Sequence, residues 1–342
     1  MSENPLSRAG ILMVLLVVIV IGSWEVYLRY TGVTISYDNG KELWADKRAM
    51  VYEPADKATV FLGSSRIKYD LDIDTWEKIT GRHAIQLAAE GSTPVTVLVD
   101  LGNDLKFKGK VVVDVTEMLF FSPPMPDDRQ VQYVAYYKSR TPAQRASFVL
   151  DHALESQFVF LDGYFLSLND GLEKLKIPDR PGVFVFPSFP LDFQVTSFNR
   201  QNKMTDKFLV DTSLQHWVQN NWLFIMNLGK MAPRPKTDPV PGIVESVKNA
   251  VDKIRARGGD VVFIRPPSSG PFLQMEQHVF PRAKLWEPLL AATHSVGVHY
   301  SDYPATDHFI CPEWSHLSPQ DAVLYTKALI TELPPSFVGQ KN

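Results

Sequence analysis

The sequence has almost no cysteine, little net charge and no internal repeats, and each shortage excludes a class of protein. A single cysteine, Cys311, occurs in 342 residues, so neither an intrachain disulfide nor a cysteine-rich zinc site can form. The formal net charge is only -3 and no long basic run is present, which removes the electrostatic basis for binding nucleic acid. The scattered histidines show no spacing typical of metal ligands. We therefore expect no metal and no nucleic-acid partner.

The remaining composition is typical of a globular protein. Hydrophobic residues make up 45% and charged residues 21% of the chain, and these values argue against disorder. A chain of this length buries a sizeable core, either as one large domain or as one domain with a large insertion.

The amino-terminal segment is the most hydrophobic part of the chain. Residues 11–21 are all apolar, and residues 9–28 reach the length of roughly 20 residues that a bilayer core requires. Trp24 and Tyr27 are spaced like the aromatic residues that gather at membrane interfaces. We therefore expect residues 1–29 to form an uncleaved membrane anchor.

A cleaved signal peptide is the alternative interpretation of this segment. The short apolar run fits the core of such a peptide, although Ile21-Gly22-Ser23 is a poor cleavage site. In either case the rest of the chain is exported. Arg8 favours a cytoplasmic amino terminus, which places the main domain on the periplasmic side of the cytoplasmic membrane.

Strand and helix patterns alternate downstream of the anchor. Residues 30–57 are polar and mixed, and we expect a stalk there. Apolar runs bounded by turn residues then predict buried strands at residues 58–62, 84–88, 111–115, 260–264 and 296–301. Helical spacing fills the gaps, with Asp74 and Ser318 as expected N-caps. This alternation predicts an α/β fold built on a doubly wound parallel sheet.

The regular pattern is interrupted between about residues 120 and 241. Prolines, aromatic residues and helical pieces mix there, and the clearest helical pattern covers residues 209–231. We expect this insertion to lie within an α/β domain of residues 58–335, followed by a tail at residues 336–342. Three aromatic residues of the insertion are expected in a packed core rather than on a carbohydrate-binding surface: Trp217, Trp222 and Phe224.

Candidate functional residues follow the predicted strands where those strands end. In an open α/β sheet, ligands bind outside the carboxyl ends of the strands. Ser65 follows the first strand in Gly63-Ser64-Ser65, and Gly91 follows the second, where a backbone N–H can receive an oxyanion. Glu313 and His316 follow the last strand. A serine nucleophile needs a base and the base needs an orienting group, so we expect Ser65, His316 and Glu313 in these roles.

Each of these assignments has an alternative. Ser64 is the second choice as nucleophile, and His308 is the rival base. The orienting group for the histidine can also be Asp307 or a backbone carbonyl. Arg66 and Arg265 follow strands as well, and each fits either an anionic or sugar substrate or a structural salt bridge.

The arrangement resembles the SGNH (GDSL-type) hydrolase superfamily. The Gly-Asp-Ser motif of that family matches Gly63-Ser64-Ser65, its second-motif glycine matches Gly91, and its Asp-x-x-His motif matches Glu313-Trp314-Ser315-His316. The resemblance covers residues 58–332 apart from the insertion. It implies a flavodoxin-like α/β/α sandwich. Gly-Ser-Ser behind one anchor is most similar to the membrane-tethered branch, which serves polysaccharide O-acetylation and teichoic-acid D-alanylation.

The resemblance implies a function that needs no cofactor. Ser65 is expected to carry an acyl group, with acetyl as the expected group, in an O-acyltransferase or acylesterase that acts on a cell-surface polysaccharide. The expected partner is a membrane-bound O-acyltransferase that donates the acyl group. A soluble periplasmic esterase released by signal cleavage is a further alternative.

Two departures from the family pattern bear on activity. The third motif, Gly-x-Asn-Asp, should supply an oxyanion-hole asparagine after the third strand, yet the chain reads Asp114-Val115-Thr116-Glu117 there. Leu101-Gly102-Asn103-Asp104 precedes that strand, and we interpret it as a helix end and loop. Loss of one oxyanion donor costs on the order of 10²–10³ in rate, which argues against efficient hydrolysis of free esters. Slow transfer, a different oxyanion donor and an inactive accessory protein are the alternatives. The second departure, Glu313 in place of aspartate, lengthens the arm of the carboxylate.

Overall fold

The computed structural model describes residues 5–124, 128–166, 186–231 and 237–339, and it divides the chain into two compact units. One unit comprises Asn39–Thr141 and Pro187–Asn342, and the other comprises Met1–Asp38 and Pro142–Phe186. We refer to them as the sheet unit and the anchor unit.

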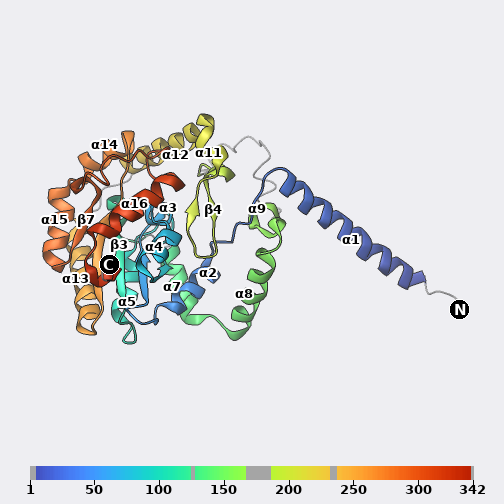
Figure 1. Ribbon diagram of the computed structural model, residues 1–342, viewed down its shortest axis with the longest axis horizontal. Helices are drawn as coiled ribbons and strands as arrows, with labels where there is room; N and C mark the ends of the chain where they lie inside the picture. Colours follow the sequence, from blue (N-terminus) through green and yellow to red (C-terminus); the bar gives the residue numbers. More distant parts are fainter. Residues whose placement is uncertain (1–4, 125–127, 167–185, 232–236, 340–342) are drawn as a thin grey trace. The chain divides into compact units, whose positions relative to one another are not determined.

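The sheet unit is built on five parallel strands in the order β2-β1-β3-β6-β7. The strands are β1 (Ala58–Leu62), β2 (His83–Gln86), β3 (Lys110–Asp114), β6 (Asp260–Arg265) and β7 (Gly297–His299) (Figure 1). All five predicted strands are present, and their ends lie within two residues of the expected positions. The prediction of an α/β fold with a parallel sheet is confirmed.

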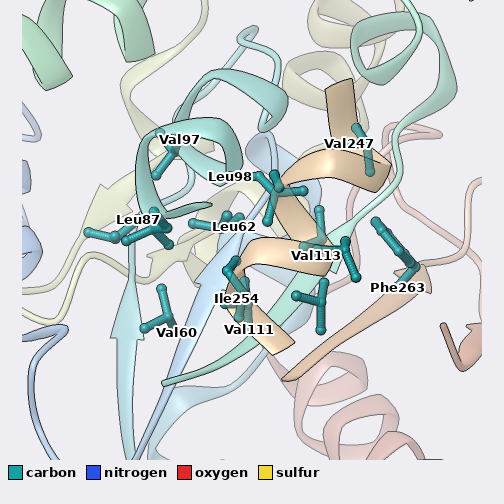
Figure 2. Close-up of a cluster of buried hydrophobic side chains, with 14 of the residues drawn as sticks. Val60, Leu62, Leu87, Val97, Leu98, Val111, Val113, Val247, Ile254 and Phe263 are labelled. Atoms are coloured by element: carbon teal, nitrogen blue, oxygen red, sulfur yellow. The ribbon is translucent and has the colours of Figure 1, made fainter. Parts of the chain in front are cut away.

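Helices cover both faces of this sheet, because the strand side chains alternate between two apolar clusters. Val60 and Leu62 point to the face covered by α5 (Val95–Asn103), α13 (Val240–Ala256) and α15 (Arg282–Thr293). Figure 2 shows the side chains of this cluster, with Leu98 and Val247 from the helices above strand residues such as Val113. Phe61 points to the other face, where α3 (Ser65–Asp70), α4 (Ile73–Thr80) and α16 (Pro319–Glu332) pack.

Capping residues set the helix ends close to the predicted positions. The Asp72 carboxylate accepts a hydrogen bond from the Thr75 N–H at 2.8 Å, so Asp72 rather than the expected Asp74 is the N-cap of α4. Gly81 ends that helix in the left-handed conformation with φ +65°. Ser318 caps α16 as predicted, because its hydroxyl accepts from the Asp321 N–H at 3.1 Å.

Two segments expected outside the domain are part of it. Residues 41–50 of the predicted stalk form helix α2 (Lys41–Met50), in which Trp44 is fully buried and its Nε1 donates to the Leu87 carbonyl at 2.8 Å. The predicted tail begins within α17 (Pro335–Val338), where Phe337 is also fully buried. The sequence pattern does not predict that these segments belong to the domain, because each packs against the core through only one or two large apolar side chains.

The insertion lies between β3 and α13 and contributes to both units. Its sheet-unit elements are α6 (Glu117–Phe120), α7 (Arg129–Ser139), η2 (Leu191–Phe193), β4 (Val195–Thr196), β5 (Asn202–Lys203), α11 (Asp206–Val210) and α12 (Thr212–Met231) (Figure 1). The predicted helix at 209–231 is therefore α12, preceded by the end of α11. Helix α14 (Gly270–Val279) follows β6.

The anchor unit contains one helix that is long and apolar enough to cross a membrane. This helix, α1 (Pro5–Tyr30), has 26 residues, and its side chains are almost all exposed. The unit also contains α8 (Pro142–Glu155), η1 (Val159–Leu161) and α9 (Gly163–Leu166). Residues 167–185 of the insertion lie outside the described residues. Uncleaved anchoring and a cytoplasmic amino terminus stay predictions.

Candidate active site

Ser65 is the first residue of α3, directly after the turn that ends β1. The turn requires glycine, because a Cβ atom added to Gly63 would lie 2.6 Å from the Cβ of Asp114 at the end of β3. The carboxyl ends of the neighbouring strands β1 and β3 therefore lie close together here. The Ser65 side chain is half-buried and stands at the carboxyl edge of the sheet, as the sequence predicts.

Ser64 occupies a different environment from its neighbour. Its side chain is buried, and its Oγ lies 2.8 Å from Thr116 Oγ1 and 3.3 Å from Asp114 Oδ2. The Ser64 N–H also donates to Asp114 Oδ2 at 3.1 Å. Burial raises the pKa of Asp114, against the opposing effects of Arg66 and these hydrogen bonds. Ser64 therefore fixes the turn, and its hydroxyl is not directed at the histidine.

His316 links Ser65 to Glu313. The Nε2 atom of His316 lies 2.8 Å from Ser65 Oγ, and its Nδ1 lies 2.9 Å from Glu313 Oε1. A carboxylate can only accept, so Nδ1 carries the proton of the neutral ring and Nε2 is left to accept from the Ser65 hydroxyl. The structure thus brings together the three residues expected as nucleophile, base and orienting group, from two segments 251 positions apart.

Two comparisons with known proteins found no match to this chain. No protein-family model matches the chain, and no curated protein matches its sequence. The functional interpretation therefore rests on the side chains themselves and on the resemblance of three short motifs.

The Glu313 side chain, which is one methylene longer than the aspartate of the family motif, folds back so that its carboxylate contacts the backbone of its own loop. Glu313 Oε1 accepts from the backbone N–H of His316 at 2.6 Å and of Ser315 at 3.3 Å, in addition to the imidazole. Trp314 between them adopts φ +80°, a left-handed conformation that costs free energy for a residue with a side chain. Glu313 is fully buried, and this loop geometry holds it against the histidine.

Trp222 of the insertion completes the environment of Glu313. Its indole Nε1 donates to Glu313 Oε2, the carboxylate oxygen that the loop leaves open. The ring centroids of Trp222, Phe193 and Tyr69 lie 6.0, 5.7 and 4.4 Å from that of His316. The insertion therefore builds part of the wall around the histidine. Sequence reasoning missed this role, because nothing in the chain pairs residue 222 with residue 313.

The other two aromatic residues singled out in the insertion are not core residues. Trp217 is 44% exposed and Phe224 is 38% exposed on α12. The prediction that they pack in a core is wrong, because α12 buries the side that carries Val218 and Met226 instead.

Arg66 and Arg265 both form buried salt bridges, which was one of the two alternatives for these residues. Both guanidinium groups pair with Glu276 of α14, and Arg265 Nε also donates to Glu117 Oε1 at 3.0 Å. Their side chains are 1% and 3% exposed. Burial alone would lower the pKa of Arg66, but the Glu276 and Glu117 carboxylates together outweigh burial and raise that pKa. Neither arginine is presented to a substrate, so the expected substrate-binding role is not observed.

Gly91 lies in the turn after β2, where it adopts φ +65°. The preceding residue, Glu90, holds this turn in place. Its Oε1 accepts a hydrogen bond from Lys68 Nζ, which lies one turn of α3 beyond Ser65. The same oxygen accepts from the Nδ2 atoms of Asn39 and Asn202, both at 2.7 Å. Burial raises the pKa of Glu90, but Lys68 and Asn202 outweigh burial and bring that pKa to about 2. The candidate oxyanion turn is therefore tied to the helix that begins with Ser65.

The loop after β3 supports the turn of Ser64 rather than an oxyanion. Asp114 and Thr116 stand where the resemblance calls for an asparagine, and both contact Ser64. Asn103, which precedes β3, is the last residue of α5 and accepts a hydrogen bond from Lys253 Nζ at 2.9 Å. This confirms its interpretation as a helix end.

The rival base and its neighbour lie apart from this arrangement. His308 is exposed, and its Nδ1 lies 3.0 Å from the Pro304 carbonyl oxygen. Asp307 is exposed as well, 3.9 Å from the ring of His308. The base position beside Ser65 is taken by His316, so neither rival contacts the nucleophile.

Proposed function

We propose that the protein is a serine-dependent acyltransferase or acylesterase, with Ser65 as nucleophile, His316 as general base and Glu313 as the group that orients His316. The observation that carries this proposal is the hydrogen-bonded series from Glu313 Oε1 through both ring nitrogens of His316 to Ser65 Oγ. Two buried members end at a half-buried hydroxyl, which is the arrangement that activates a serine.

The reaction proceeds in two balanced steps. Ser65 Oγ attacks the carbonyl carbon of an acyl donor, while its proton passes to His316 Nε2. The donor's carbonyl-to-heteroatom bond then breaks, and the leaving group takes that proton, which leaves an ester on Ser65. A sugar hydroxyl, or water in the esterase version, gives its proton to His316 and attacks this ester. The bond between the acyl carbon and Ser65 Oγ then breaks, Ser65 Oγ takes the proton from His316 Nε2, and the acylated product departs.

The substrate class follows from the resemblance and from α1. We propose an SGNH-like protein of the cell envelope that transfers an O-acyl group, with acetyl as the expected group, to a cell-surface polysaccharide. A helix long and apolar enough to span a membrane supports anchoring beside a membrane-bound O-acyltransferase, which would donate the acyl group. The catalytic domain would then face the periplasm.

Transfer is favoured over hydrolysis by the surroundings of His316. The rings of Tyr69, Phe193 and Trp222 pack against the imidazole, and His316 is only 1% exposed. The loop after β3 also supplies no asparagine to the oxyanion. Both features favour a slow reaction with a bound sugar hydroxyl over fast hydrolysis of free esters.

The test compares matched serine and histidine variants in an ester-hydrolysis assay and in glycan acylation by cells. Ser65→Ala and His316→Ala should abolish both activities. Ser246→Ala, on the exposed face of α13, and His308→Ala should leave both unchanged. Full glycan acylation by cells that carry the Ser65 and His316 variants would refute the catalytic proposal.

A non-catalytic accessory protein is the second candidate, favoured by the missing asparagine after β3. Such a protein would bind glycan or scaffold the membrane enzyme without forming an ester on Ser65. It predicts that deletion of the gene abolishes glycan acylation, while Ser65→Ala restores it to the level of the native chain. The catalytic proposal predicts no restoration by that variant.

A further inference from the structure

Helix α8 of the anchor unit exposes its apolar side. Val149, Leu150 and Leu154 are 63%, 66% and 50% exposed, and none of the described residues 142–155 is buried. With 3.6 residues per turn, these three side chains fall within an arc of about 140° on one side of the helix. We refer to them as the apolar face of α8.

The opposite side of α8 is the one that contacts the rest of the anchor unit. The ring of His152 lies 5.4 Å from that of Tyr37, and the Phe148 ring stacks on His152 at 6.2 Å. The Glu155 carboxylate accepts a hydrogen bond from the backbone of Asp38, while burial and the negative charge of the Asp38 side chain act to raise the pKa of Glu155. An amphipathic helix in a globular protein normally turns its apolar side inward. In α8 the polar side is turned inward and the apolar face outward.

The segment that follows α8 is fixed to the carboxyl-terminal end of α1. Arg29 Nη2 donates to the Gln157 carbonyl at 2.7 Å. The backbone N–H groups of Val159 and Phe160 donate to the Glu25 carboxylate at 3.2 and 3.0 Å. These contacts lie in one compact unit, so α8 is held close to the last two turns of α1.

Those last turns belong at the surface of a membrane if α1 spans it. A helix of 26 residues is about 39 Å long, which exceeds the roughly 30 Å of a hydrocarbon core. The aromatic rings of Trp24 and Tyr27 stack at 5.5 Å in these turns, and such rings prefer the interface. Glu25 and Arg29 form an ion pair there. The bilayer that receives α1 therefore ends beside α8.

We propose that α8 is an interfacial helix whose apolar face, Val149, Leu150 and Leu154, is embedded in the lipid of the membrane that α1 spans. The occupant is the bilayer, because α1 itself brings lipid to this position and the reversed amphipathic orientation suits it. The proposal goes beyond the acyl-transfer function and does not depend on it. Two membrane contacts, one spanning and one lying flat, hold the anchor unit at the surface more firmly than α1 alone.

The test measures the depth of single labels in the full-length chain, purified in detergent and reconstituted into phosphatidylcholine and phosphatidylglycerol vesicles. Leu150→Cys and Leu154→Cys carry an environment-sensitive fluorophore on the apolar face. Asp151→Cys, next to Leu150 and also exposed, is the matched control on the polar side. The native Cys311 is 1% exposed and does not compete for the label under native conditions.

The proposal predicts a blue-shifted emission from positions 150 and 154. Lipids brominated on the upper acyl chain should quench these labels at least about twofold more than the label at position 151. Aqueous iodide should show the reverse order. Circular dichroism establishes that each labelled chain is folded, and the two face positions guard against a defect of one variant.

Two results would overturn the proposal. Equal quenching of all three positions by iodide, with none by brominated lipid, would mean that α8 stands in water. Protection of positions 150 and 154 from iodide without quenching by lipid would mean that protein covers the face. Dependence of that protection on the protein-to-lipid ratio would identify a second copy as the cover. Neither result bears on Ser65, which is assayed separately by ester hydrolysis.

Discussion

Two clusters of hydrogen-bonded side chains begin at adjacent residues of this protein, and they differ in whether they hold compensating charges or a hydroxyl that can react. Ser65 begins the series that runs through His316 to Glu313, and Arg66 begins the one that runs through Glu276 to Arg265 and Glu117. In the arginine cluster each carboxylate faces a guanidinium group, and the charges compensate one another. In the serine cluster one carboxylate faces an imidazole rather than a guanidinium group, and the series ends at a half-buried hydroxyl.

This difference separates a structural role from a reactive one. A buried ion pair contributes little when complete but is costly to break, because the remaining charge stays buried without a partner. A hydroxyl that donates to an imidazole keeps the capacity to transfer its proton when a carbonyl approaches. Variants of the serine cluster should therefore lose activity and keep stability, and variants of the arginine cluster should show the opposite.

The largest effect is expected from Ser65→Ala. Removal of the nucleophile should lower kcat for ester hydrolysis by about 10³-fold or more, as in other serine enzymes. The thermal unfolding midpoint should stay within a few degrees of the native value, because the side chain is only half-buried. Steady-state kinetics and calorimetry measure the two quantities. A large fall in the midpoint would mean that the serine cluster is structural after all.

Glu313→Gln should have the next largest effect. The amide keeps the shape but removes the negative charge that faces His316 Nδ1. Its N–H₂ group must also face either Trp222 Nε1 or the three donors at the Oε1 position, which include His316 Nδ1. We expect kcat to fall by about 10²–10⁴-fold with KM little changed, as steady-state kinetics would show. The conservative control is Glu313→Asp, whose shorter carboxylate should retain part of the activity. Equal loss in both variants would contradict an electrostatic role.

Glu276→Ala should destabilise the protein without altering its chemistry. It leaves Arg66 and Arg265 buried without their shared carboxylate, which costs on the order of 3–5 kcal/mol in the free energy of unfolding. Urea titration measures this loss. The fraction that stays folded should keep a kcat within about threefold of native, because Glu276 bonds to the two arginines and not to the serine cluster. A selective loss of kcat at unchanged stability would assign the arginine cluster to the reaction.

Trp222→Phe should have the smallest effect, and it tests whether the indole of Trp222 contributes to the serine cluster. The variant keeps an aromatic ring but removes the hydrogen bond to the Glu313 carboxylate. A hydrogen bond to a charged group contributes about 1.5–3 kcal/mol, so we expect kcat to fall by about 10–100-fold.

The matched control is Trp217→Phe, an exposed indole on the same helix, which should change nothing. The effect on stability distinguishes a positioning role from simple packing. Loss of the indole hydrogen bond should lower kcat while KM and the thermal unfolding midpoint stay near their native values. A fall in kcat accompanied by a large fall in the midpoint would favour a packing defect instead.

The sheet and the serine cluster could be predicted because their signals are local. An unbroken run of β-branched residues such as Val111, Val112 and Val113 is typical of a buried strand. The order of the strands then places two short motifs at the same edge of the sheet, Gly63-Ser64-Ser65 and Glu313-Trp314-Ser315-His316. Topology then brings the motifs together without any knowledge of side-chain packing.

The partners of these motifs could not be predicted in the same way. Trp222 meets Glu313 across 91 positions, and Arg66 meets Glu276 across 210, with no motif around either partner. The sequence predicts a stalk where α2 lies, because the composition there is polar apart from a few apolar residues such as Trp44. Such contacts depend on how helices pack, which periodicity does not specify.

Catalysis by Ser65 is tested by detection of the ester that forms on its hydroxyl. The protein is mixed with an activated acetyl ester, quenched in acid within milliseconds to seconds, and digested with trypsin for mass spectrometry. Cleavage after Lys57 and Arg66 releases residues 58–66, and fragmentation separates Ser64 from Ser65. The native protein should carry an acetyl group on Ser65 that is absent from the His316→Ala variant. Acetylation of Ser64, or no acetylation of this peptide while the native protein turns over the ester, would contradict catalysis by Ser65.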